Sequence, residues 1–124
     1  MFPPVYDTLA SDSDVVSLIG DSDGDVPVYE FDYVPPGIAR PYVAFQVVYG
    51  TPEIYLGDRP NVDAVGIQFD VYARTGEDCQ EIFEAVRDAV EGVAHVVSYQ
   101  GASRDRKETL AYQITFTADW FVDR

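Results

Sequence analysis

Acidic side chains at regular spacing near the amino terminus are the first candidates for chemistry in this chain. Four aspartates stand at positions 1, 3, 5 and 12 of a calcium-binding loop: Asp21, Asp23, Asp25 and Asp32. The match fails because Val26 replaces the glycine required at position 6, Pro27 follows, and no helical pattern comes next. We therefore interpret the segment 21–25 as a solvated loop and predict no metal site.

Side chains able to do catalysis are scarce. His95 is the single histidine, and we interpret it as a structural or half-buried residue of a strand rather than a base. No cluster has zinc-ligand spacing, and the chain has neither a glycine-rich phosphate loop nor a nucleophile elbow. Carboxylates are so abundant that a catalytic pair stays open, although a solvated acidic face is the stronger interpretation. We predict that the protein is not an enzyme, has no catalytic residue and uses no cofactor.

Charge also limits the partners. The chain has 22 acidic residues against 8 basic ones, a formal charge of −14, and the acidic residues are spread along its length. Tight binding to phosphate backbones needs clustered Lys and Arg, so specific binding of nucleic acid is not expected. Solubility is the simpler explanation of the charge, and repulsion of nucleic acid is the alternative. No signal peptide is recognisable, and no apolar stretch approaches the about 18 residues of a membrane span.

One strand and one helix in the middle of the chain are the elements most clearly encoded. Residues 63–74 alternate apolar and polar side chains, which predicts a strand with one buried face: Val65, Ile67, Phe69, Val71 and Ala73. The next residues predict a helix, Gly76–Glu91, with one apolar stripe: Cys79, Ile82, Phe83, Val86, Ala89 and Val90. Thr75 and Asp78 have capping-box spacing, and Gly92 suits a left-handed helix end. As the only cysteine, Cys79 is expected to be a buried, inert thiol.

The remaining segments predict a sheet with helices on one face. An amino-terminal helical segment, one bent helix or two short ones, precedes an edge strand within 26–33 and a more central strand, Tyr42–Tyr49. In that second strand, alternation places Val43, Phe45, Val47 and Tyr49 on one face. Two late strands, within 94–100 and 109–121, are expected to pair as a hairpin. The fold class is therefore α+β, with a mainly antiparallel sheet and two helical segments packed on one face, in a single domain, 1–124. A parallel crossover around the central helix stays open.

The segment Gly50–Asn61 is the candidate interaction site. It is long, and it has apolar residues, Ile54, Tyr55 and Leu56, between proline and glycine. A loop of this kind is usually functional if ordered, although it can also pack on its own sheet as a hairpin. Our hypothesis is that these residues contact a neighbouring protein and that Arg59 adds an ion pair to an acidic partner.

Several strings, in this order and spacing, resemble the tail completion, or tail terminator, family of long-tailed phages and prophages. They are MFPPVYDTLASDSDVVSLIGD, ARPYVAFQVVYGTPEIYLGDRPNVD, QFDVYARTGEDCQEIFEAVRDAVEG and YQITFTADWFVDR. The most telling piece is the strand from Gln68 to Ala73 that leads into the helix containing Ala85 to Ala89. The resemblance covers essentially the whole chain, but it brings no catalytic motif and no binding residue with it.

The resemblance implies a structural virion protein in the neck region of the tail, assembled in the host cytoplasm. Members form a homo-oligomeric ring, commonly a hexamer, at the head-proximal end of the tail tube. The ring ends tube polymerisation and joins the tail to the head connector or head-closure protein. DNA would pass through the lumen without specific binding, which suits an acidic chain. The alternatives are another phage neck component, such as a head-closure or adaptor protein, and a small-ligand or enzymatic α+β module.

Overall fold

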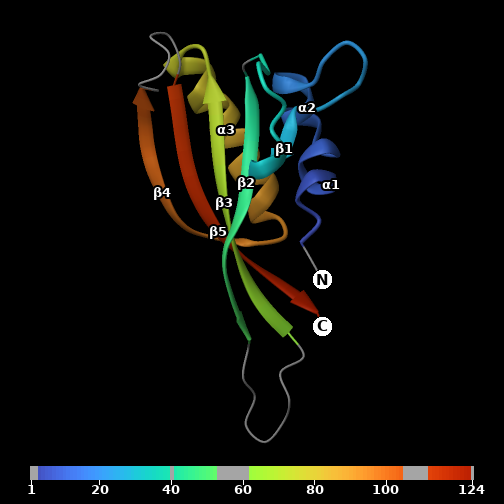
Figure 1. Ribbon diagram of the computed structural model, residues 1–124, viewed down its shortest axis with the longest axis vertical. Helices are drawn as coiled ribbons and strands as arrows, with labels where there is room; N and C mark the ends of the chain where they lie inside the picture. Colours follow the sequence, from blue (N-terminus) through green and yellow to red (C-terminus); the bar gives the residue numbers. More distant parts are fainter. Residues whose placement is uncertain (1–2, 40, 53–61, 105–111, 124) are drawn as a thin grey trace, which may run out of the picture.

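A five-stranded sheet runs through the molecule in the order β1-β2-β3-β5-β4 (Figure 1). The computed structural model describes residues 3–39, 41–52, 62–104 and 112–123. The strands are β1 Val28–Glu30, β2 Tyr42–Pro52, β3 Val62–Ala73, β4 His95–Arg104 and β5 Tyr112–Asp123. β1 pairs with β2 in parallel, and the other three pairings are antiparallel. The prediction of an α+β fold with a mainly antiparallel sheet is therefore confirmed.

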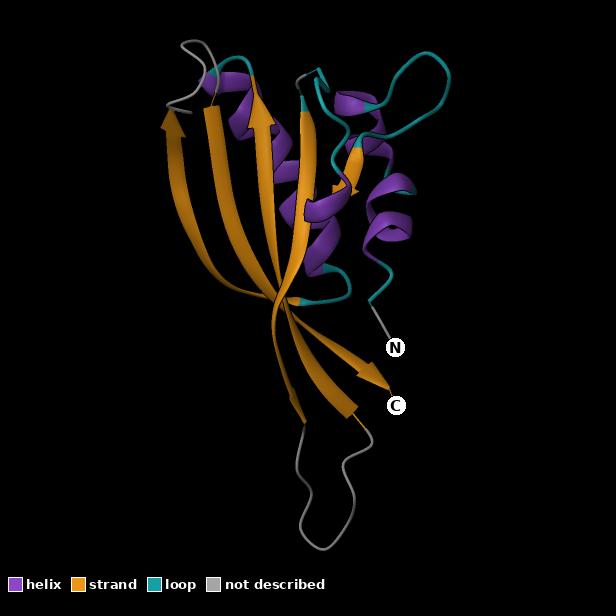
Figure 2. Ribbon diagram, viewed as in Figure 1, coloured by secondary structure: helices purple, strands orange, loops and turns teal. Residues whose placement is uncertain are grey.

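Helices cover one face of this sheet (Figure 2). They are α1 Val5–Ala10, α2 Ser13–Ile19 and α3 Gly76–Glu91. The amino-terminal segment is thus two short helices, divided where the Asp12 side chain caps α2 by accepting from the backbone N–H groups of Asp14 and Val15. α3 packs on β3, β4 and β5, and both short helices pack on α3.

The core lies between α3 and the inner, helix-facing side of the sheet. Phe69 on β3 and Phe116 on β5 stack with ring centroids 4.7 Å apart. Phe83 on α3 meets the Phe116 ring edge-on at 5.5 Å. All three rings are at most 4% exposed. The alternation predicted for β3 and the apolar stripe predicted for α3 meet here, as neither element can bury its apolar face alone.

The ends of α3 agree with the sequence except in one detail. The helix spans Gly76–Glu91 as predicted, and the Thr75 side chain accepts a hydrogen bond from the Asp78 N–H at 3.1 Å. Gly92, however, has φ −67° and lies in the right-handed region, so the predicted left-handed end is wrong. The helix instead ends where the Val90 carbonyl accepts from the N–H groups of both Val93 and Ala94. These two bonds satisfy that carbonyl without a left-handed residue.

Chain order explains the middle of the sheet. β3 and β4 both run antiparallel to β5, so they are parallel to each other and α3 is their crossover. β5 then returns from β4 and inserts between them, which confirms the predicted hairpin of the last two strands. The hairpin that the sequence predicted and the parallel crossover that it left open are therefore both present in this sheet.

Three strands differ in length from expectation, and one of them is β4, which continues to Arg104, four residues beyond the predicted 94–100. The predicted edge strand within 26–33 keeps only Val28–Glu30, because the chain turns into a short 3₁₀ helix at Phe31–Tyr33. β2 in contrast continues to Pro52, three residues into the predicted loop. β1 therefore covers β2 only along Val43–Phe45.

Candidate assembly interface

β2 and β3 continue past the helices as a hairpin arm, here defined as Gln46–Pro52 and Val62–Ile67 (lower part of Figure 1). The two strands stay paired to the tip, where Pro52 lies opposite Asp63. β5 pairs with β3 along the whole described length of the arm, and Asp123 lies opposite Val62. The arm is thus supported by a third strand, and Pro52 and Val62, which flank the segment 53–61 in the sequence, lie on neighbouring strands.

A β-bulge at Val48 sets the faces of the arm. The pairing Val47 with Ile67 is followed by Tyr49 with Gly66, so β2 has one residue more than β3 at this point. The extra residue moves Tyr49 to the outer side of the sheet, away from the helices. The expectation that Tyr49 shares a face with Val43, Phe45 and Val47 is therefore wrong, because alternation does not survive a bulge.

The Tyr49 side chain then spans a neighbouring strand. Its ring lies over Gly66 so closely that any Cβ at that position would overlap it. Beyond Gly66, the hydroxyl donates a hydrogen bond to the carboxylate of Asp119 on β5. This bond, partial burial and the charge of Asp119 raise the pKa of the Tyr49 hydroxyl above its usual value of 10.0. The contact ties β2 to β5 across β3.

A second polar cluster lies on the outer face of the sheet, outside the hairpin arm. Asp70 on β3 is only 3% exposed, and its carboxylate accepts from the Thr115 hydroxyl at 2.7 Å and from the Gln113 side-chain amide at 3.2 Å. The Tyr42 and Tyr72 rings stack beside it at 4.7 Å. Neutral donors satisfy the carboxylate, so the cluster joins β3 to β5 as a structural network.

The predicted interface residues lie outside the described residues. Ile54, Tyr55, Leu56 and Arg59 all belong to the segment 53–61, which connects β2 and β3 in the sequence. The structure therefore describes the support of this segment, the hairpin arm, but not the side chains that we assigned to the contact.

Exposed apolar side chains, whose exposure the sequence analysis did not predict, gather on β2 and at β4. On β2 they are Val47, Val48 and Tyr49, and at β4 they are Val93, Val97 and Tyr99. Tyr99 is 67% exposed although its ring lies 6.0 Å from that of Phe83. A signal was present in the sequence, since the string HVVSYQ has no charged side chain to protect an edge strand.

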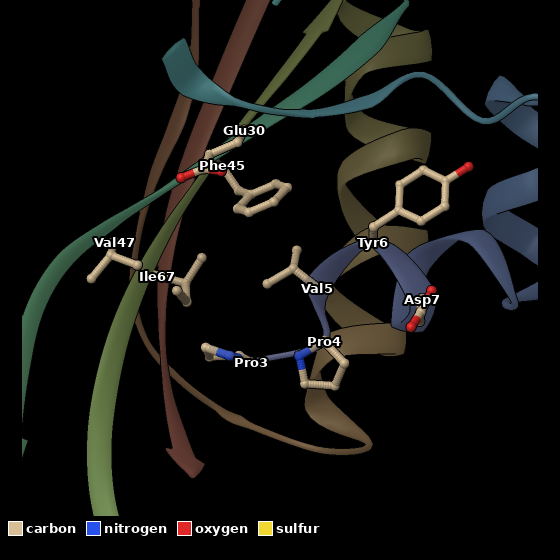
Figure 3. A pocket seen from close by; sticks show the side chains of 9 residues that line it. All are labelled: Pro3, Pro4, Val5, Tyr6, Asp7, Glu30, Phe45, Val47 and Ile67. Atoms are coloured by element: carbon tan, nitrogen blue, oxygen red, sulfur yellow. The ribbon is translucent and has the colours of Figure 1, made fainter. Parts of the chain in front are cut away.

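A pocket of about 300 Å³ lies between α1 and the start of the arm (Figure 3). Its apolar lining comes from Pro3, Pro4 and Val5 on one side and from Phe45, Val47 and Ile67 on the other. Tyr6, Asp7 and Glu30 complete it. Because most of the lining is apolar, this pocket suits binding of an apolar side chain.

The other residues considered for chemistry have structural roles. Asp21 accepts from the N–H groups of Asp23 and Asp25, both at 2.9 Å, so its carboxylate closes the turn. His95 starts β4 but is exposed, so the half-buried position is wrong. Cys79 is buried, as predicted, and its thiol donates a hydrogen bond to the Val71 carbonyl at 3.5 Å. Across the described part of the chain, no group of three or more His, Cys, Asp or Glu could hold a metal. No helix among the described residues is long and apolar enough to cross a membrane.

Comparisons with known proteins agree with this architecture. The family model described as "Tail completion protein gp17" matches residues 3–123. One solved structure, "Virion of native gene transfer agent (GTA) particle", contains a chain that superposes with a TM-score of 0.67 at 19% identity. The match covers 97% of this chain and 92% of that chain, so the two share a fold over nearly their whole length. No curated protein matches the chain.

Proposed function

The chain belongs to the tail completion protein gp17 family, and from this membership we propose that it forms a ring that closes the head-proximal end of a phage tail tube. It is a structural protein of the phage tail or neck. In the proposal, residues 1–124 act as one domain and the ring is a hexamer. The ring stops tube polymerisation and presents a surface to the head connector, without catalysis.

The family match over residues 3–123 is the observation on which the proposal rests. The gene transfer agent particle supports it, because a chain of the same fold is part of that virion. The fold itself offers a reason for assembly: exposed apolar side chains occupy β4, an outer strand of the sheet, and the part of β2 that β1 does not cover, where a monomer would be expected to place charges.

Charge supports the proposed path of DNA. A formal charge of −14 makes every subunit repel phosphate, so a lumen made from this chain would let a genome pass without retaining it. The same charge makes the subunits repel each other, so we expect ring assembly to strengthen as salt rises towards about 0.15 M and screens that repulsion.

Within the ring, we assign the contact with the tail tube or with a neighbouring subunit to Ile54, Tyr55, Leu56 and Arg59. The hairpin arm supports this assignment, since β2 and β3 extend past the helices (Figure 2) and these residues belong to the segment that connects the two strands. Apolar residues at the end of such an arm, on an acidic molecule, would act as a small anchor.

Negative-stain microscopy of the purified protein, alone and with tail tubes, tests the ring. A ring with a central hole, seated at one end of the tube, is the expected image. Co-purification with the portal in preference to the tube would instead identify a different neck component. A protein that stays monomeric and unattached to tubes would overturn the proposal.

A variant tests the arm. Changing Ile54, Tyr55 and Leu56 together to Ser is expected to leave far-ultraviolet circular dichroism and melting temperature close to wild type while abolishing ring formation or tube attachment. A triple variant that folds and still completes tails at normal yield would remove these residues from the contact, and one that unfolds would place them in the core.

A further inference from the structure

Two strand edges of this chain have no partner among the described residues. β4 pairs only with β5, so its outer edge is open along its ten residues. β2 is covered by β1 only along Val43–Phe45, so its edge is open from Gln46 onward. These edges lie at opposite ends of the sheet (Figure 1). Open edges are templates for pairing with another chain.

Both edges are also free of acidic residues in a strongly acidic chain. β2 has no charged residue at all, and in β4, with His95 neutral at pH 7, the only charged residue is Arg104 at its end. The chain has 22 acidic residues in 124, so most of its surface repels a second copy. Because β2 and β4 have no acidic residue, their open edges are places where two copies can approach without this repulsion. A second copy of the chain is therefore the partner that these edges fit.

Tyr99 at the edge of β4 and the pocket at the edge of β2 lie on the same side of the sheet. Tyr99 of β4 lies on the inner side of the sheet, since it is paired with the buried Phe116 and its ring contacts Phe83 of α3. The pocket beside the open edge of β2 is on that same inner side, between α1 and the side chains of Phe45, Val47 and Ile67 (Figure 3). When a rotation repeats a sheet around a ring, the inner side of each copy joins the inner side of the next. Tyr99 of one copy would then point towards the pocket of its neighbour.

We propose that β4 of one copy pairs with the open edge of β2 in the next copy and that its Tyr99 ring fills the pocket between α1 and β2. This contact joins two different surfaces, so it repeats head to tail and can close into a ring. Backbone hydrogen bonds supply the pairing, and Tyr99 supplies an aromatic anchor with Asp7 and Glu30 near its hydroxyl. The inference rests on the proposed ring and names the surfaces that build it.

Cross-linking between two single variants tests the pairing directly. Val47→Cys labels the β2 edge and Val97→Cys labels the β4 edge, while the native Cys79 is fully buried and stays unreactive. With a short bismaleimide in the presence of tail tubes, the mixture of the two variants is expected to give a cross-linked dimer. Neither variant alone should do so, because like edges do not meet. The double variant should give a ladder that ends at the copy number of the ring.

Controls separate this inference from the ring itself. Leu18→Cys, exposed on α2, should cross-link with neither variant. A ring seen by microscopy without β2–β4 cross-links, or with cross-links between like edges, would overturn the pairing and leave the proposed function standing. Absence of both the ring and the cross-links would overturn the two together.

A side-chain variant tests the anchor. Tyr99→Ser is expected to weaken ring assembly by about tenfold or more, as removal of a central aromatic does. Phe121→Ser is the matched control, because Phe121 is an aromatic of 55% exposure on the opposite face of the sheet. Circular dichroism verifies that both variants fold. Equal assembly of Tyr99→Ser and wild type, or an equal loss in Phe121→Ser, would show that Tyr99 is not the anchor.

Discussion

The hydroxyl of Tyr49 on β2 donates a hydrogen bond to the carboxylate of Asp119 on β5, although β3 lies between the two strands. The contact is possible only because the strand in between has glycine at position 66, over which the ring lies. An aromatic ring that covers a glycine restores packing which the missing side chain would otherwise leave open. The hairpin arm is therefore fastened to the body of the sheet on its outer side, at the level where β1 and the helices no longer support it.

The raised pKa of Tyr49 predicts a pH-dependent contribution to stability. The pKa is higher in the folded protein than in the unfolded chain, so the contribution is fully present below about pH 10 and is lost as pH rises through the folded value. Tyr49→Phe should lower the free energy of unfolding by about 0.5–1 kcal/mol at pH 7, a small value because the side chain is 41% exposed.

Urea unfolding of both proteins from pH 7 to pH 11 measures this difference. The gap between wild type and Tyr49→Phe should stay constant up to about pH 10 and shrink above it. A gap that widens with rising pH would contradict the hydrogen bond to Asp119, because it would mean that the folded state favours the ionised phenol.

Gly66→Ala should displace the Tyr49 ring. A Cβ at position 66 overlaps the ring, so we expect a loss of about 1–3 kcal/mol, as for other overpacked sites. The same substitution in a Tyr49→Ala background should cost clearly less, because the ring that causes the clash is gone. Equal costs in both backgrounds, measured by denaturant unfolding, would show that the ring does not need glycine beneath it.

Phe83→Ala tests the packing of α3 on the sheet. The ring is 4% exposed and packs on Phe116, and the Arg87 guanidinium lies 5.4 Å from its centroid. We expect a loss of about 3–5 kcal/mol in the free energy of unfolding. Val16→Ala, at an exposed position on α2, is the reference, with an expected change within about 0.5 kcal/mol. Similar small losses in both variants would place Phe83 outside the core.

The acidic loop 21–25 is predicted to fold without calcium. Asp21→Asn combined with Asp23→Asn should keep the turn, because an asparagine side-chain oxygen can accept the same backbone hydrogen bonds as Asp21. Differential scanning fluorimetry with and without calcium should show no shift in melting temperature for either protein. A calcium-dependent shift in wild type that disappears in the double variant would identify a metal site after all.

The sequence predicted an element correctly where the cap and the apolar pattern that define it lie within the element itself. The bounds of α3 followed from the Thr75 cap and the apolar stripe, and the buried face of β3 followed from simple alternation. The bulge at Val48 had no such signal, because it depends on how β2 is paired with β3, and it reversed the face of Tyr49. The short length of β1 likewise depends on the turn into the 3₁₀ helix at Phe31–Tyr33.

The candidate site was less accessible to sequence reasoning. Open edges can be recognised only once the strand order is known, and the order places β5 between β3 and β4 against the sequence order. In the sequence, nothing distinguishes Tyr99 from other aromatic residues of a strand, and its high exposure is known only from the structure. The residues chosen from the sequence, Ile54, Tyr55, Leu56 and Arg59, lie outside the described residues and stay a prediction.

The growth of tail tubes in the presence of this protein shows whether it ends tube polymerisation. Purified tail tube protein is allowed to polymerise from preformed tubes, with and without the added protein, and tube lengths are measured by electron microscopy. We predict that tubes exposed to the protein stop growing and have a ring at one end, while tubes without it continue to lengthen. Continued growth at the same rate, with no ring on either end, would contradict the account.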